Sequence, residues 1–458
     1  MNLVVVGASY RTAPIDVLER LSVAPAELTA ILERLLAQPR VGEAVVVSTC
    51  NRVEVYAAVN GFHGGLADVS AVLAEQAGCD PGQLAPHLYV HYDAAAVEHV
   101  FRVAAGLDSL VVGEAQILGQ IRDAYRVAAE ADAVGRLLHE LLQQALRVGK
   151  RAHAETGIDR AGRSVVTAAL DLAARHLGGE LAARPAMVIG AGGMGALAAA
   201  TLSRRAASPL LITNRSADRA ARLAESYGAR AVPFSELVDA LATVDVVVCA
   251  TAAIRPVLTR EVISQALLRR TGDDPLILLD LAVPRDVEPA AAALPGVRVI
   301  DIDGLAASLP DSADVDAAGA ATAEAAAAGE IVSDEVESFL TWLRAADIAP
   351  TVAALRARAE QVVTAELRRL AQRRPDLTDE QRAEVAHTVH RVVQRLLHSP
   401  TVRVRQLAAE PGGEQYSALL RELFDLEVSQ PAPADAVPRL DQDPDCGAAR
   451  LDSSDGAR

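Results

Sequence analysis

The sequence is poor in lysine and cysteine, and both shortages narrow the possible chemistry. Lys150 is its single lysine, which excludes a Walker-type phosphate loop and leaves one candidate for Schiff-base chemistry. The cysteines Cys50, Cys79, Cys249 and Cys446 show no CxxC spacing, and the histidines form no ligand cluster. We therefore expect a reducing compartment, no disulfide framework and no bound metal.

Positive charge and long apolar runs are also scarce. Lys and Arg number 44 against 60 Asp and Glu, a formal net charge of -16, which argues against a chain wrapped uniformly in nucleic acid or lying on an anionic membrane. Any nucleic-acid contact must therefore be local. The uncharged stretch 186–202 contains glycines that suit a buried strand, turn and helix. With no basic segment before the first apolar run, the chain is predicted to be cytoplasmic.

The length of 458 residues and the changes of pattern predict a multidomain α/β protein. Residues 1–157 mix short strands and helices irregularly, which indicates an α+β domain. Residues 160–307 alternate apolar strands with helical stretches, the pattern of a Rossmann-type doubly wound sheet. A long connecting helix over 311–346 then leads to an all-α dimerisation domain over 347–427, and the tail 428–458 is predicted to be disordered.

A glycine pattern marks the first strand of the second domain. Gly190-x-Gly192-x-x-Gly195 follows the strand "AMVI" and opens a helical run, so the turn can approach a pyrophosphate while the helix N-terminus stabilises its charge. After the next strand, where an NAD enzyme carries an acidic residue, this chain has "NRS" at 214–216. These groups favour NADPH. Taken alone, Arg215 is also consistent with a solvated surface residue that binds no cofactor.

Cys50 lies at a sharp junction between two predicted strands. It follows "AVVV" and precedes "VEVYAAV", and its immediate neighbours are polar. Arg52 can lower the pKa of a nearby thiol or hold a carboxylate. The pattern leaves two interpretations open, a reactive thiol and a small structural core residue. Cys79 and Cys249 are predicted to be structural.

A second polar cluster follows in "HVFRVAAGLDSLVVGEAQILGQ". Gln116 and Gln120 are four residues apart and share a face of the predicted helix, with Glu114 beside them. Taken by itself, this segment is typical of an amphipathic helix with a polar side, with Ser109 as a cap and His99 as a packed histidine.

Taken together, these segments resemble one known family. "STCNRVEVY", "FRVAAGLDSLVVGEAQILGQ", "VIGAGGMG", "NRS" and "DLAVPRDVEP" occur in the order found in glutamyl-tRNA reductases, and the resemblance covers about residues 1–425. It implies an enzyme that uses NADPH to reduce glutamyl-tRNA(Glu) to glutamate-1-semialdehyde through a cysteine thioester, the first step of the five-carbon route to tetrapyrroles such as haem. It also implies a homodimer and a transient complex with the aminomutase that acts next.

The resemblance implies roles for individual residues. Cys50 is the nucleophile, and His99 supports activity. The positions that match substrate binding are Thr49, Asn51, Arg52, Ser109, Glu114, Ala115, Gln116 and Gln120. Those that match cofactor binding are Gly190, Ala191, Gly192, Gly193, Met194, Gly195, Asn214, Arg215 and Ser216. The chain departs from residues common in the family at Tyr10 and Val53, and also at Ala115 and Gly193, where no reacting group is removed.

The chemistry is consistent with these roles. A free carboxylate resists hydride, whereas a thiolate converts an aminoacyl ester into a thioester whose carbonyl accepts hydride more readily. Because the cofactor and Cys50 are expected on different domains, the sequence predicts a domain closure. Two alternatives stay open. One is a shikimate-dehydrogenase-like oxidoreductase acting on a small molecule, which would not need Cys50, and the other is a non-catalytic tRNA-binding relative.

Overall fold

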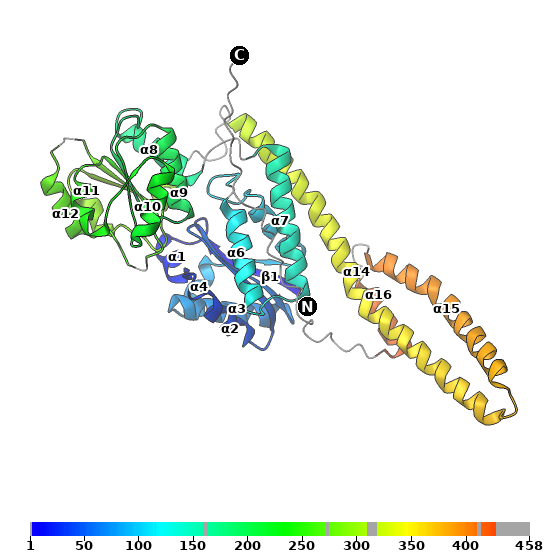
Figure 1. Ribbon diagram of the computed structural model, residues 1–458. Helices are drawn as coiled ribbons and strands as arrows, with labels where there is room; N and C mark the ends of the chain where they lie inside the picture. The colour runs from blue at the N-terminus through cyan, green and yellow to red at the C-terminus, as the bar shows by residue number, and fades with distance from the viewer. Residues whose placement is uncertain are drawn as a thin grey trace, which may run out of the picture.

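The computed structural model describes residues 2–114, 116–158, 164–253, 255–271, 274–308, 318–409 and 414–426. Figure 1 shows a central domain, a second domain beside it, and a long helix that runs along the central domain and carries the last helices of the chain away from it. The predicted combination of an α+β domain, a doubly wound domain and an all-α part joined by a long helix is confirmed.

The first domain is organised around an antiparallel four-stranded sheet in the order β2-β3-β1-β4. Its strands are β1 (Asn2–Ser9), β2 (Val41–Ser48), β3 (Arg52–Val59) and β4 (Tyr89–Tyr92). Every residue of β3 is buried, because helices cover the sheet. These helices are α1 (Ile15–Leu21), α2 (Leu28–Leu36), α3 (Phe62–Ala77), α4 (Pro81–Leu84), α5 (Ala94–Ala104), α6 (Gln116–Glu130) and α7 (Arg136–Thr156).

A glycine in β1 makes room for a charged side chain within this sheet. Gly7 of β1 lies opposite Glu54 of β3. A Cβ atom added at Gly7 would lie 2.7 Å from the Glu54 Cγ atom, so a larger residue would push Glu54 out of its place. The Glu54 side chain can therefore lie across the neighbouring strand, fully buried.

The second domain contains a six-stranded sheet in the order β10-β9-β8-β5-β6-β7, and all its strand pairs are parallel. Its strands are β5 (Ala186–Ile189), β6 (Leu210–Thr213), β7 (Arg230–Ala231), β8 (Val246–Cys249), β9 (Leu276–Asp280) and β10 (Val297–Ile300). Its helices are α8 (Val165–His176), α9 (Gly193–Arg204), α10 (Ala217–Ser226), α11 (Leu237–Leu241), α12 (Arg260–Arg269) and α13 (Ile302–Ser308). The strand order reverses between β5 and β8, and such a switch point is where open α/β sheets bind ligands.

The two domains are in direct contact. Ile15, Leu110 and Val111 of the first domain are buried in the same apolar cluster as the core of the second. Beside this cluster, Arg285 of the second domain pairs with Glu19 of the first, with 2.9 Å between the Arg285 Nη2 and Glu19 Oε2 atoms. Apolar burial and an ion pair therefore both hold the domains together.

The helix α14 (Ala318–Arg373) is 56 residues long, which corresponds to about 84 Å at 1.5 Å per residue. The prediction that this helix ends at 346 was wrong, because it continues through Pro350. A proline inside a helix removes one backbone hydrogen bond, but Ile348 and Val352 on either side of it are buried in a small apolar cluster. Residues 311–317 of the predicted helix lie outside the described residues.

Side-chain contacts join α14 to the first domain. Phe339 of α14 packs edge-on against Phe101 of α5, with 5.8 Å between the ring centroids, and Glu335 pairs with Arg151 of α7 at 2.8 Å. Farther along, α15 (Asp379–Ala409) and α16 (Glu414–Phe424) pack back against α14 (Figure 1). The large apolar residues exposed on α14, α15 and α16 are Val362, Val385, Val392, Leu396, Val402, Leu419, Leu423 and Phe424.

The predicted tail, 428–458, lies outside the described residues. Within the described ranges, no helix is both long and apolar enough to cross a membrane.

Candidate active site

Cys50 lies in the tight turn between β2 and β3. The Thr49 side-chain oxygen accepts hydrogen bonds from the backbone N–H groups of Asn51 and Arg52, both at 3.1 Å. The Thr49 N–H donates to the Arg52 carbonyl at 2.8 Å. These three bonds fix the turn, so the junction predicted from the sequence is present and the strand ends hold the thiol in place.

The polar residues predicted around Cys50 come together in one small cavity. Its lining residues are Thr49, Cys50, Asn51, Arg52, Ser109, Glu114, Gln116, Ile117, Gln120 and Met194. Ala115 lies outside the described residues, and Ile117 was not predicted. Met194 belongs to the predicted cofactor loop, so this Cys50 cavity lies where the two domains meet. Its volume of about 10 Å³ has room for about one water molecule, so a group as large as an amino acid enters only when the lining moves.

The Cys50 thiol is protonated at neutral pH. Burial raises its pKa from 9.0 to about 12, and the charge of Glu114 contributes to this increase. The charge of Arg52 lowers the pKa but is the smallest of the effects. Arg52 thus acts in the expected direction, but burial outweighs its charge and the thiol pKa stays high. Cys50 needs a nearby base in order to act as a nucleophile.

Glu114 is the carboxylate that shares the cavity with Cys50. Its side chain is nearly buried, and burial raises its pKa from 4.5 to about 7. Within the described residues its carboxylate makes no hydrogen bond or ion pair. The preceding residue, Gly113, has φ +85°, and a Cβ atom there would lie 2.4 Å from the Ile158 carbonyl oxygen, so this turn requires glycine. An unpaired carboxylate with a pKa near 7 is suited to accept a proton.

Asn51 supplies a second unpaired acceptor. Its Oδ1 atom is buried and has no hydrogen-bond partner among the described residues, whereas its backbone carbonyl accepts a bond from the Tyr10 N–H at 3.0 Å. Leaving a buried acceptor unpaired costs about 1–3 kcal/mol. The cavity thus offers acceptors on Asn51 and Glu114 to a ligand that carries N–H groups.

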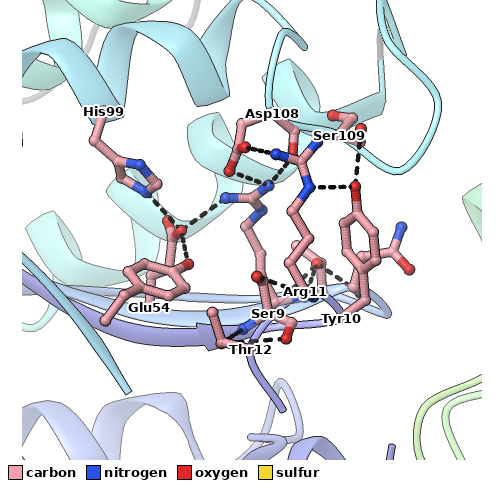
Figure 2. A network of polar contacts seen from close by, with 12 residues as sticks. Ser9, Tyr10, Arg11, Thr12, Glu54, His99, Asp108 and Ser109 are labelled. Carbon is pink, nitrogen blue, oxygen red and sulfur yellow. Dashed lines mark hydrogen bonds and ion pairs between the residues drawn. The ribbon is translucent and has the colours of Figure 1, made fainter. Parts of the chain in front are cut away.

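Arg52 belongs to a buried network of ion pairs. Its side chain is 2% exposed, and its Nη1 atom lies 2.7 Å from Glu54 Oε1 while its Nη2 atom lies 3.0 Å from Asp108 Oδ2. Figure 2 shows Tyr10 and Arg11 reaching the same segment around Asp108. Both terminal nitrogens of Arg52 already have carboxylate partners, so this geometry does not support the expected binding of a ligand carboxylate by Arg52.

Glu54 is the central residue of this network, although its sequence context predicted no role for it. Besides Arg52, its carboxylate accepts hydrogen bonds from Tyr89 and from Tyr56, the latter at 2.7 Å, and lies 2.8 Å from His99 Nε2. The charges of Arg52 and His99 hold its pKa well below the ordinary value despite its burial. One feature of the sequence could have predicted the pairing of Arg52 with Glu54: the two residues are two apart on a strand and therefore share a face.

His99 lies in a different cavity from Cys50. Its ring stacks on that of His91, with 4.2 Å between the centroids, and Figure 2 shows it pointing toward Glu54. This second cavity has a volume of about 380 Å³ and shares no lining residue with the first. It is lined by Ser9, Arg11, Thr12, Tyr89, His91, Ala95, Glu98, His99, Arg102 and Asp108. His99 therefore reaches the Cys50 cavity indirectly, through Glu54 and Arg52.

The predicted cofactor loop connects β5 to α9, and its glycines differ in how closely other atoms pack against them. Gly190 has φ +117°, and a Cβ atom there would lie 2.3 Å from the Ala250 carbonyl oxygen; one at Gly195 would lie 2.1 Å from the Gly190 oxygen. These two positions are closely packed, whereas a Cβ at Gly192 or Gly193 would have no atom within 4 Å. The open part of the loop lies at the N-terminus of α9, where a pyrophosphate fits.

The segment 214–216 follows β6 at the same end of the sheet. The Asn214 side chain donates to the Ser216 carbonyl at 3.2 Å. Arg215 is exposed and makes no ion pair with the described residues. An exposed cation beside the loop suits a phosphate group. No cluster of three or more His, Cys, Asp or Glu residues that could hold a metal occurs in the described part of the chain.

Family models match three parts of the chain. "Glutamyl-tRNAGlu reductase, N-terminal domain" matches residues 6–156, "Shikimate / quinate 5-dehydrogenase" matches 171–307, and "Glutamyl-tRNAGlu reductase, dimerisation domain" matches 327–426. The dehydrogenase match is confined to the second domain, so it does not account for the Cys50 cavity or the helical part.

Similar proteins extend over nearly the whole chain. A glutamyl-tRNA reductase of Salinispora arenicola is 68% identical over 462 residues and covers 100% of both chains. One of Salinispora tropica is 68% identical over 451 residues and covers 98% of both chains. Among solved structures, glutamyl-tRNA reductase from Methanopyrus kandleri is 31% identical, with a TM-score of 0.48, and covers 93% of this chain and 99% of that one.

Proposed function

The chain belongs to the glutamyl-tRNA reductase family, and from this premise we propose how its residues work. It reduces glutamyl-tRNA(Glu) to glutamate-1-semialdehyde with a nicotinamide cofactor, the first step of tetrapyrrole biosynthesis. We propose that the cofactor is NADPH and that the reaction passes through a thioester on Cys50. One observation carries this proposal: Cys50 and Met194 of the cofactor loop line the same cavity.

Glu114 acts as the proton acceptor in the first step, although its position matched substrate recognition. As the Cys50 sulfur attacks the ester carbonyl, Glu114 takes the thiol proton; the bond between the carbonyl carbon and the ribose oxygen then breaks, and Glu114 returns the proton to that oxygen. The products are a Cys50 thioester and tRNA with a free hydroxyl, with no net change in protons. A pKa near 7 suits both transfers at neutral pH.

Neutral groups of the cavity bind the glutamyl moiety. The orphaned Oδ1 of Asn51 accepts from the α-ammonium group. The amides of Gln116 and Gln120, in the first turns of α6, donate to the side-chain carboxylate together with the Ser109 hydroxyl. Arg52 holds the segment that carries Ser109, because it donates to the backbone and side chain of the preceding residue. Thr49 fixes the turn itself.

The second domain holds the cofactor at the Cys50 cavity. When bound, NADPH supplies the hydride that reduces the thioester to the aldehyde. The open part of the loop at Gly192 and Gly193 would hold the pyrophosphate, and Arg215 and Ser216 would bind the 2′-phosphate that NADH lacks. Met194 closes the cavity. The cavity is too small for the glutamyl group, so substrate binding requires the domains to separate and reaction requires them to close.

His99 is a positioning residue. It touches Glu54, which in turn holds Arg52 in place. Its loss changes activity through this buried network and not through contact with the sulfur.

The helical part makes the protein a homodimer. Its match is to a dimerisation domain, and the exposed apolar side chains of α14, α15 and α16 provide a surface to bury. We also propose a transient complex with glutamate-1-semialdehyde aminomutase, because a reactive aldehyde is best passed on directly. A cytoplasmic location accords with the free cysteines Cys50, Cys79 and Cys249 among the described residues.

The test is NADPH oxidation on addition of glutamyl-tRNA, with uncharged tRNA plus free glutamate as the control. We expect oxidation only with the charged tRNA, and none for Cys50→Ser. A shikimate-dehydrogenase-like enzyme would retain its activity in Cys50→Ser, and a non-catalytic relative would bind charged tRNA without oxidising NADPH. Either result would overturn the proposed mechanism.

A further inference from the structure

We propose that the second cavity binds the terminal nucleotide of the tRNA, an inference that rests on the proposed function. The ester that Cys50 attacks carries a ribose, a base and a phosphate beside its carbonyl, and the Cys50 cavity of about 10 Å³ has no room for them. The second cavity, of about 380 Å³, falls within the range of about 300–1,000 Å³ found for small-ligand sites.

The two cavities are connected by residues that are adjacent in sequence and by one ion pair. Asp108 lines the second cavity and the next residue, Ser109, lines the first. Arg52, which lines the first, pairs with Asp108 at 3.0 Å. An ester that crosses the segment at Asp108 and Ser109 therefore places its glutamyl group in the Cys50 cavity and its nucleotide in the second cavity.

Aromatic side chains give the second cavity a surface for a base. The rings of His91 and His99 are stacked, and Tyr89 lies 5.5 Å from each of them, centroid to centroid. Burial and the neighbouring His99 lower the pKa of His91, so its ring is neutral at physiological pH. His91 makes no hydrogen bond with the residues that the structure describes. Unpaired nucleotides are recognised by such stacking and by hydrogen bonds to base edges.

The charged groups of the cavity suit the rest of a nucleotide. Arg102 is exposed and has no ion-pair partner among the described residues, so it is available to a phosphate. Arg11 and Asp108 pair with each other at 2.9 Å, whereas the carboxylate of Glu98 has no ion-pair partner among the described residues. A carboxylate there accepts hydrogen bonds from a ribose hydroxyl or an exocyclic amine but would repel a second phosphate. The site therefore fits a single nucleotide better than a longer strand.

The experiment compares two substrates, glutamyl-tRNA and a glutamate α-thiobenzyl ester that lacks any nucleotide. The variants are His91→Ala, His91→Phe and Arg102→Ala, and the matched control is Arg147→Ala, an exposed arginine of α7 that lines neither cavity. We expect His91→Ala to raise KM for glutamyl-tRNA about tenfold, which corresponds to about 1.4 kcal/mol of lost stacking. Arg102→Ala should raise it about fivefold, and His91→Phe should restore most of the affinity.

The substrate without a nucleotide separates this inference from the proposed function. With the thiobenzyl ester, every variant should match the wild type. Equal losses on both substrates, or no loss with glutamyl-tRNA, would overturn the nucleotide site. If the wild type reduced neither substrate, the proposed function itself would fall.

Discussion

Replacing Glu114 by glutamine tests the proton-transfer step directly. Glutamine keeps the size of the side chain but cannot accept the proton. General-base catalysis typically contributes about 10²–10⁴-fold, so we expect acylation of Cys50 to slow at least about 10²-fold with little change in KM. The assay is single-turnover formation of radiolabelled glutamyl-enzyme without NADPH. In the wild type the rate should fall as the pH drops below about 7, where Glu114 gains a proton; Glu114→Gln should lack this inflection.

The same substitution should stabilise the protein. The folded state raises the pKa of Glu114 from 4.5 to about 7, so it binds the proton more tightly than the unfolded state does. The resulting stability is complete below the unfolded pKa of 4.5 and is lost as the pH rises through about 7. Above pH 7 the buried charge costs about 3 kcal/mol, at 1.36 kcal/mol per pKa unit. Urea unfolding of Glu114→Gln should show this gain near pH 8 and none near pH 4.

Alkylation of Cys50 by iodoacetamide separates loss of a base from general damage. The charge of Glu114 raises the thiol pKa, so its removal should speed alkylation while acylation slows. Gln120→Ala, which changes the same cavity without removing a titratable group, should retain the inflection near pH 7. If Glu114→Gln acylates Cys50 at the wild-type rate with the wild-type pH profile, Glu114 is not the proton acceptor.

Three further substitutions test the network, the cofactor and the domain contact. Glu54→Gln leaves Arg52 buried with one partner fewer and should cost about 3–5 kcal/mol in urea unfolding; a loss below about 1 kcal/mol would contradict the buried pairing. Arg215→Ala should raise KM for NADPH about tenfold and leave KM for NADH unchanged, whereas equal changes would argue against 2′-phosphate recognition. Arg285→Ala removes the ion pair with Glu19 between the domains and should speed alkylation of Cys50; an unchanged rate would mean that this pair does not restrict opening.

Much of the fold was predictable because it depends on local patterns. Short apolar runs became the strands of both sheets, and the glycine pattern after β5 became the predicted turn and helix. The extent of α14 was not predictable. Pro350 normally ends or kinks a helix, and the burial that lets the helix continue comes from Ile348, Val352 and Ala408. Ala408 lies on α15, so this packing exists only after the chain has folded back on itself.

The candidate site likewise has one part that local sequence predicts and one part that depends on tertiary packing. The turn around Cys50 was predictable because its hydrogen bonds join residues that are adjacent in sequence. The contacts of Arg52 and His99 were not predictable, because both residues bind Glu54. The Glu54 side chain has space only because Gly7 lies opposite it on the neighbouring strand. The charge of Arg52 lowers the pKa of the Cys50 thiol, but burial raises it by more. The sheet supplies the ion-pair partners of Arg52, and burial sets the pKa of the thiol. The base that we propose is Glu114, whose carboxylate has no partner among the described residues.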